Sequence, residues 1–396
     1  MSDLRALCDT ARALRQACQP ALLVTLVAAR GSSYRRPGAR LLITSPDAIA
    51  VADGVLTGSV SGGCLERDLA RRGWWRLTDG RPTLVSYDSS EDDELGWRLG
   101  PGCGGTLELL LERFAPNGSP GAVDPLAFIE DCMAAQQSGV MLTVFRSNLS
   151  DVPVGARMAL RESRELVARP SLLGSSVGSA LAASARQALA AASPTGLLTF
   201  AGGAVQALIE AVLPPPHLFL FGCGRDAVPV ARLARGLGWT VSVWTPRPRF
   251  ELTARFSGLA DHLHNGAAAT LTGPVNAAAN ALAVVMSHNL DDDRAALAAL
   301  LPSRARYIGV LGPRRRTQRL LSELPVPQVQ GRGGGSAARL YAPVGLAIGA
   351  ETPDEIALAI IGEAQAVLAG ATATGHLRDR ESIHDPAPAV AQAVRR

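Results

Sequence analysis

Residues 30–40 read R-G-S-S-Y-R-R-P-G-A-R, and residues 56–66 read L-T-G-S-V-S-G-G-C-L-E, with short apolar runs between them. The second stretch ends in a turn formed by Ser61, Gly62 and Gly63, which leads into a charged, helix-compatible segment. Glycine has no Cβ atom, so such a turn can adopt positive φ and let a bound group approach the backbone. The pattern predicts strands, a tight glycine-rich turn and then a helix over residues 65–76.

Cys64 stands at the expected start of that helix, and its position has two interpretations. A thiol at a helix N-terminus experiences the positive end of the helix dipole, which favours the thiolate. Unpaired backbone N–H groups at the same place suit an anion. The alternative is a buried free cysteine in a tight turn, which is a common environment for this residue. A second glycine-flanked cysteine follows in Gly102-Cys103-Gly104-Gly105.

The composition describes a compact chain with room for two or three domains. It has 396 residues, of which 47% are apolar and 19% charged, and a formal net charge of +4. The basic residues are dispersed, without the aromatic-interleaved stripe of a nucleic-acid-binding surface, so we expect no nucleic-acid partner. There is no apolar signal core or membrane-length apolar run. Six cysteines without C-x-x-C spacing predict a reduced, cytoplasmic protein.

We expect residues 1–213 to form one domain with a degenerate internal repeat, its halves lying at about 1–115 and 125–213. Gly155-Ala156-Arg157-Met158 matches Gly38-Ala39-Arg40-Leu41, and residues 173–177 match residues 56–60, both at an offset of 117 residues. The common offset argues against coincidence, which is the alternative explanation. The second half has no counterpart of Cys64 or Cys103, as expected if those cysteines are functional.

The sequence beyond Pro214-Pro215-Pro216 alternates between strands and helices. This alternation predicts a Rossmann-like, doubly wound parallel sheet over residues 214–370, followed by a tail over 371–396. The whole chain is therefore expected to be α/β, with an α+β domain preceding the Rossmann-like domain.

The turn Gly222-x-Gly224-x-x-Ala227 lies between an apolar strand and a helix, which is the context of a phosphate-binding turn. The acid that binds ribose hydroxyls in NAD sites is absent after the next strand, where Thr245-Pro246-Arg247 stands. Arg247 could instead meet a 2′-phosphate. The alternative is a turn that only packs helix on strand.

Two more polar clusters follow later strands of this domain. His288 lies in Ser287-His288-Asn289, and Arg314 begins an arginine run at the start of a helix. Cations are unfavourable at that end of a helix unless an anion is present, so the run favours phosphate. A structural hydrogen bond for His288 and a solvated helix face for the arginines are the alternatives.

Together these motifs resemble the XdhC/CoxI family, the accessory proteins of xanthine dehydrogenase and carbon monoxide dehydrogenase type molybdenum enzymes. The likeness covers nearly all of residues 20–370. Its matching segments are Gly31-Ser32-Ser33, Arg36-Pro37-Gly38-Ala39, residues 58–66, residues 102–105, Phe221 to Pro229, Tyr307-Ile308-Gly309, Gly312 to Arg316, Ala342 to Leu346 and Thr352 to Ala357.

The resemblance implies a maturation factor without turnover of its own. Such a protein binds molybdenum cofactor (molybdopterin), assists its sulfuration with a cysteine desulfurase and inserts it into a molybdenum hydroxylase apoenzyme. We expect a homodimer. Cys64 is expected to face the metal or the sulfur, with Cys103 second, because soft thiolates suit a thiophilic metal. The expected cofactor-binding residues are Arg36, Arg40, Ser61, Gly62, Gly63, Cys64, Glu66, Gly102, Cys103, Gly104, Gly222, Gly224, Asp226, Arg247, His288 and Arg314.

The chain departs from the family pattern at three places in its C-terminal half. Thr245 and Ala347 stand where family members usually carry an acid, and Asn289 stands where they carry the Asp of a His-Asp pair. These departures weaken the case for a nucleotide such as NAD(P) there. The alternative function is an NAD(P)-dependent oxidoreductase that uses the Gly222–Ala227 turn and His288 as an acid–base group.

Overall fold

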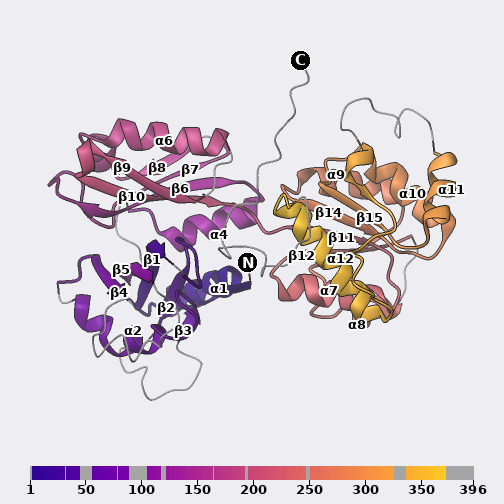
Figure 1. Cartoon of the computed structure of the whole chain (residues 1–396), viewed down its shortest axis with the longest axis horizontal. Helices are drawn as coiled ribbons and strands as arrows, with labels where there is room; N and C mark the ends of the chain where they lie inside the picture. Colours follow the sequence, from indigo (N-terminus) through magenta and orange to yellow (C-terminus); the bar gives the residue numbers. More distant parts are fainter. Residues whose placement is uncertain are drawn as a thin grey trace. The chain divides into compact units, whose positions relative to one another are not determined.

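A computed structural model describes residues 2–31, 33–44, 56–77, 79–88, 105–116, 122–163, 165–191, 195–246, 250–324 and 336–371. The chain forms two compact units, which meet in sequence at Pro214 and Pro215 (Figure 1). No helix in these ranges combines the length and the apolar character that a bilayer crossing requires.

The first unit contains two five-stranded antiparallel sheets with equivalent strand orders, β3-β2-β1-β5-β4 and β8-β7-β6-β10-β9. The equal order confirms the internal repeat, with β6 to β10 as the counterparts of β1 to β5. The strands are β1 (Ala21–Gly31), β2 (Arg40–Ile43), β3 (Leu56–Gly58), β4 (Thr83–Asp88), β5 (Gly105–Phe114), β6 (Gly139–Ser147), β7 (Arg157–Arg161), β8 (Leu166–Ala168), β9 (Gly196–Phe200) and β10 (Val205–Val212).

The helices of this unit repeat as well. Helix α1 precedes the first sheet and α4 the second, and each half also has a helix that follows its third strand (Figure 1). The helix predicted over 65–76 is observed as two elements, the α-helix α2, which ends before Gly73, and the 3-10 helix η2, which follows it. The helices are α1 (Ser2–Gln16), α2 (Glu66–Arg72), η2 (Trp74–Leu77), α4 (Pro125–Ala135), α5 (Pro170–Leu173), α6 (Gly178–Ala190) and η3 (Ala201–Gly203).

The two sheets share a buried cluster to which each half contributes equivalent residues. Strand β1 has one extra residue opposite β5, Val27, and strand β6 has one opposite β10, Phe145. Both extra side chains pack into one cluster with Leu110 and Leu208. Such bulges redirect a side chain, and here both face the junction of the two halves.

The second unit is a six-stranded parallel sheet of order β13-β12-β11-β14-β15-β16. Numbered along the chain this order is 3-2-1-4-5-6, the Rossmann arrangement, which confirms the predicted fold. Its strands are β11 (His217–Phe221), β12 (Thr240–Thr245), β13 (His262–Asn265), β14 (Ala281–Val285), β15 (Tyr307–Val310) and β16 (Leu340–Tyr341).

Helices cover both faces of this sheet, as a doubly wound fold requires (Figure 1). Helices α7 and α12 pack in one apolar cluster, and α9, α10 and α11 pack in the other. The bounds are α7 (Ala227–Gly236), α8 (Phe250–Arg255), η4 (Ala268–Leu271), α9 (Thr272–Ala277), α10 (Leu290–Leu300), α11 (Arg314–Ser322), η6 (Ser336–Arg339) and α12 (Pro353–Leu368).

Candidate functional site

Glu66 organises the turn that carries Cys64. Its carboxylate is buried and accepts hydrogen bonds from the backbone N–H groups of Val60 (3.0 Å), Ser61 (2.9 Å) and Gly63 (3.0 Å). The hydroxyls of Ser59 (2.8 Å) and Ser61 also donate to it. Burial opposes ionisation, but the hydrogen bonds from Ser61 and Ser59 outweigh it and lower the pKa of Glu66.

The donors that we expected to face a ligand anion are therefore occupied by the protein's own carboxylate. Ser61 is buried, and its hydroxyl also accepts the N–H of Leu65 at 3.0 Å. Glu66, Ser61 and the N–H of Gly63 shape the turn in place of the direct ligand contacts that the motif suggested. Helix α2, which follows, has only seven residues.

Cys64 itself is exposed and forms no disulfide. This excludes the interpretation of a buried cysteine in a tight turn. The two glycines before it, Gly62 and Gly63, have φ of 139° and 114°, so the turn needs residues without a Cβ atom. Among the described residues, nothing lies within 4 Å of a Cβ atom built on Gly63.

The loop around Arg36 lies against the same turn. A Cβ atom built on Gly62 would come within 3.1 Å of the Tyr34 ring. Arg36 is exposed, and Tyr34 is 67% exposed. Because Gly31 pairs with Gly105 across β1 and β5, the start of β5 belongs to the same end of the sheet. Residues Gly102, Cys103 and Gly104 lie outside the described residues.

Arg40 has a structural role in place of the expected cofactor contact. It is buried, and its Nη2 donates to Glu210 of the second half at 2.7 Å. The repeat supplies a matching pair, in which Arg157 of the second half binds Glu112 of the first half through both of its terminal nitrogens. Two buried ion pairs thus join the halves in opposite directions.

In the second unit, the glycine turn with Asp226 lies close to His288 at the switch point between β11 and β14, where Rossmann folds bind ligands. Asp226 Oδ2 lies 2.7 Å from His288 Nε2. His288 has φ of 61°, an uncommon conformation for a residue with a side chain. The two loops touch there, because a Cβ atom on Gly222 would lie 2.4 Å from the Met286 carbonyl oxygen.

The carboxylate of Asp226 changes the chemistry expected at this turn. A Cβ atom on Gly224 would lie 2.3 Å from Asp226 Oδ1, so the carboxylate folds back over the glycine turn. It puts negative charge at the start of α7, where we expected a phosphate. The pairing of Asp226 with His288, which sequence reasoning missed, suits proton transfer better than pyrophosphate binding.

The other predicted residues of the second unit do not join the Asp226–His288 pair in the described structure. Arg314 is exposed at the start of α11, while the nearby Arg316 pairs with buried Asp293 at 2.8 Å. Asn289 caps α10 by accepting the N–H of Asp291 at 2.9 Å. Thr245 is buried, and Arg247 lies outside the described residues.

Ala347 lines a mostly apolar pocket of about 460 Å³ near the ends of β15 and β16. In the described ranges, no group of three or more His, Cys, Asp or Glu side chains is placed to hold a metal ion.

Comparison with known proteins identifies the class. Residues 14–88 match the model of the XdhC and CoxI family, and residues 218–364 match that of the XdhC Rossmann domain. The chain belongs to the XdhC and CoxI family.

Individual relatives extend the likeness over the chain. It is 29% identical over 351 residues to a Bacillus subtilis (strain 168) protein described as a probable xanthine dehydrogenase subunit, and the match covers 89% of this chain and 94% of that one. Over 162 residues it is 30% identical to the uncharacterized Escherichia coli K12 protein YqeB, covering 41% of this chain and 29% of YqeB. A crystal structure of a xanthine dehydrogenase from Bacillus halodurans superposes with a TM-score of 0.68 at 26% identity, covering 98% of each chain.

Proposed function

We propose that the protein is an accessory protein of a xanthine dehydrogenase-type molybdenum hydroxylase, which binds molybdenum cofactor and takes part in its sulfuration and insertion. The observation that carries the proposal is the exposed Cys64 on a turn held by Glu66. The family and the relatives named after xanthine dehydrogenase support the link to that enzyme, and cofactor binding, sulfuration and insertion are the proposed part. The cofactor's metal would supply a thiophilic centre, for which a cysteine sulfur is a suitable ligand.

The chain's own residues fit one side of that cofactor. Cys64 is exposed, and no described residue lies within 4 Å of a Cβ atom built on Gly63. The backbone donors of the turn are occupied by Glu66, so the cofactor's phosphate would have to be held by other groups. Cys64 presents the sulfur, and Glu66 positions it by fixing the turn.

The same proposal defines the partners. A molybdenum hydroxylase apoenzyme receives the cofactor, and a cysteine desulfurase supplies the sulfur. A homodimer remains a prediction.

The test is the cofactor load of protein purified from a host that makes molybdenum cofactor. We expect wild-type protein to carry molybdenum and pterin, and Cys64→Ser to lose most of both. Cys18→Ser is the matched control, because Cys18 is also an exposed free cysteine of the first unit. Equal loads in all three proteins, or no load in the wild type, would contradict the proposal.

An NAD(P)-dependent oxidoreductase is the second candidate. The Rossmann strand order and the Asp226–His288 pair at its switch point favour it. The negative charge of Asp226 at the expected phosphate site weighs against it. Metal-free protein that oxidises NADPH with a small carbonyl compound, and loses this activity in His288→Ala, would favour the oxidoreductase.

A further inference from the structure

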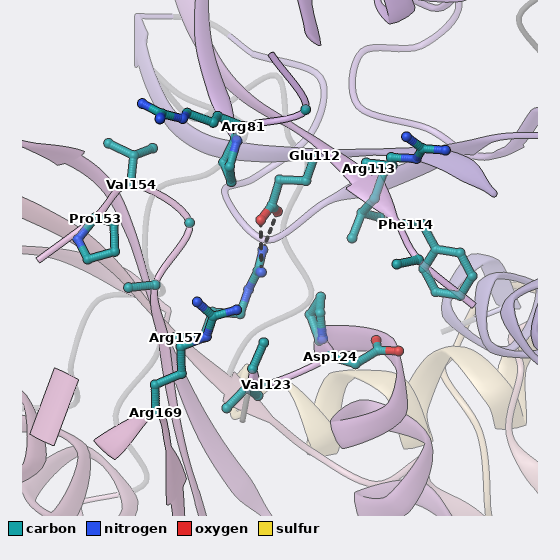
Figure 2. Close-up of a pocket in the computed structure, with 18 of the residues that line it drawn as sticks. Arg81, Glu112, Arg113, Phe114, Val123, Asp124, Pro153, Val154, Arg157 and Arg169 are labelled. Atoms are coloured by element: carbon teal, nitrogen blue, oxygen red, sulfur yellow. Dashed lines mark hydrogen bonds and ion pairs between the residues drawn. The ribbon is translucent and has the colours of Figure 1, made fainter. Parts of the chain in front are cut away.

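A pocket of about 350 Å³ opens between the two halves of the first unit (Figure 2). The end of β5 and the segment Gly80–Pro82 line it from the first half, and residues 153–157 and Arg169 line it from the second. Its volume lies within the range of small-molecule sites. Gly155 (φ 82°) brings the two sides together, because a Cβ atom there would lie 2.5 Å from Pro82.

The place of the pocket in the repeat is informative. Strand β8 is the counterpart of β3, and Arg169 follows β8 directly as the Cys64 turn follows β3. Residues 153–156 likewise correspond to residues 36–39, the loop beside that turn. The pocket therefore lies at the end of the second sheet that corresponds to the Cys64 end of the first.

The carboxylates that line the pocket are already neutralised. Glu112 binds Arg157 through two hydrogen bonds, drawn as dashed lines in Figure 2. Asp124 caps α4 and pairs with Arg15 at 2.8 Å. Neither carboxylate is therefore available to balance further positive charge in the pocket.

Three further arginines line the pocket, and they carry uncompensated charge. Arg81, Arg113 and Arg169 are exposed, and none of them has a side-chain hydrogen bond or ion pair within the described residues. Figure 2 shows Arg169 beside Arg157, whereas the side chains of Arg81 and Arg113 extend from the rim of the pocket away from Glu112. The unbalanced charge at this pocket is positive, so it attracts an anion.

Apolar surfaces form much of the rest of the wall. They come from Pro82, Phe114, Val123, Pro153 and Leu172. An inorganic ion would leave these surfaces unused, whereas a flat organic body would cover them. Guanidinium groups bind phosphate oxygens through paired hydrogen bonds.

We propose that this pocket binds a phosphate monoester with an aromatic or heterocyclic body, and that Arg169 is the residue that contacts the phosphate. The site is separate from the Cys64 turn, and its existence does not depend on the proposed function. Nucleotides and phosphorylated pterins share the required chemistry.

Calorimetric titration of the full chain with phenyl phosphate at low salt tests the site. We expect binding in the millimolar range or tighter, and a loss of affinity of about tenfold or more in Arg169→Ala, because a charge-assisted hydrogen bond is removed. Arg169→Lys should keep part of the affinity. Arg186→Ala, which removes an exposed arginine of α6, is the matched control and should bind like the wild type.

Inorganic phosphate should bind more weakly than phenyl phosphate, because it cannot cover the apolar wall. Adenosine monophosphate and a phosphorylated pterin, titrated in parallel, identify the preferred body by their Arg169-dependent affinity. No binding of any phosphate ester, or equal binding by wild type and Arg169→Ala, would overturn the proposal. So would a loss of binding in Cys64→Ser, which would place the phosphate at the other site.

Discussion

The two halves of the first unit share one architecture and differ at the equivalent ends of their sheets. The first half carries an exposed cysteine on a turn that is closed by Glu66. The second half carries Arg169 after the equivalent strand, beside a pocket with excess positive charge. The sheets, the bulges and the crossed ion pairs are kept in both. The first unit thus keeps one scaffold in both halves, while the two copies carry different side chains at the equivalent ends of their sheets.

Substitutions in the two ion pairs between the halves, Arg40–Glu210 and Arg157–Glu112, are expected to have the largest effect on stability. Glu112→Ala leaves Arg157 buried without its carboxylate, so we expect a loss of about 3–5 kcal/mol in the free energy of unfolding. Glu210→Ala should have a smaller effect, because Arg40 also donates to the Gly38 carbonyl at 2.9 Å and keeps one partner. Urea denaturation of both variants measures the difference.

A double variant sharpens this result. Replacing Glu112 with Leu and Arg157 with Met removes both charges together, and should restore most of the stability that the single substitution loses. A cost below about 1 kcal/mol for Glu112→Ala would mean that the pair does not hold the halves together.

Glu66→Gln should have an intermediate effect, confined to the first half. A neutral amide replaces a carboxylate that accepts five hydrogen bonds, and we expect a loss of about 1–3 kcal/mol in unfolding free energy. The cofactor load should also fall although Cys64 is intact. A normal load in this variant would show that the turn need not be fixed for the thiol to act.

The pH dependence of this variant has a defined sign. The folded pKa of Glu66 is lowered, so its ionised form contributes stability above its unfolded pKa, and this contribution disappears as the pH falls through the folded value. The difference in stability between wild type and Glu66→Gln should therefore shrink on acidification below the unfolded pKa of about 4.3.

The smallest effect at neutral pH is expected in the second unit, which lies outside the repeat. Burial, with a smaller contribution from His262, lowers the pKa of His217 to about 4. The unfolded chain therefore binds more protons than the folded one between about pH 6.5 and pH 4, and stability falls as the pH drops through this window. His217→Phe should flatten that part of the pH–stability profile, on top of a pH-independent loss from the hydrogen bond between His217 and buried Ser242 (2.9 Å).

The sequence predicted the folds of both units and only part of the candidate site. Periodicity and turn residues are local signals. The strand–helix alternation therefore predicted the Rossmann fold, and the repeated Gly-Ala-Arg segment predicted the internal repeat. The partner of Arg40 lies 170 residues away, and no local pattern reports such a pairing. Glu66 was expected to face a ligand. Its spacing from the serines does not reveal that the backbone N–H groups of the turn bind its carboxylate instead.

The second unit shows the same limit of local patterns. The glycine turn was found, but the contact of Asp226 with His288 depends on how two separate loops meet, and a motif does not encode that distance. The pocket at Arg169 was missed for a related reason, since its wall comes from both halves.

Under the proposed function, the hydrogen bonds of Glu66 bear on how the protein would bind and release a cofactor. Because the main chain around Cys64 is already satisfied from within, capture and release of a bound group need not reorder the loop. A donor site of this kind avoids an entropic penalty at each exchange. Release of the proposed cofactor would then break its contact with Cys64 while the turn that carries the thiol stays folded.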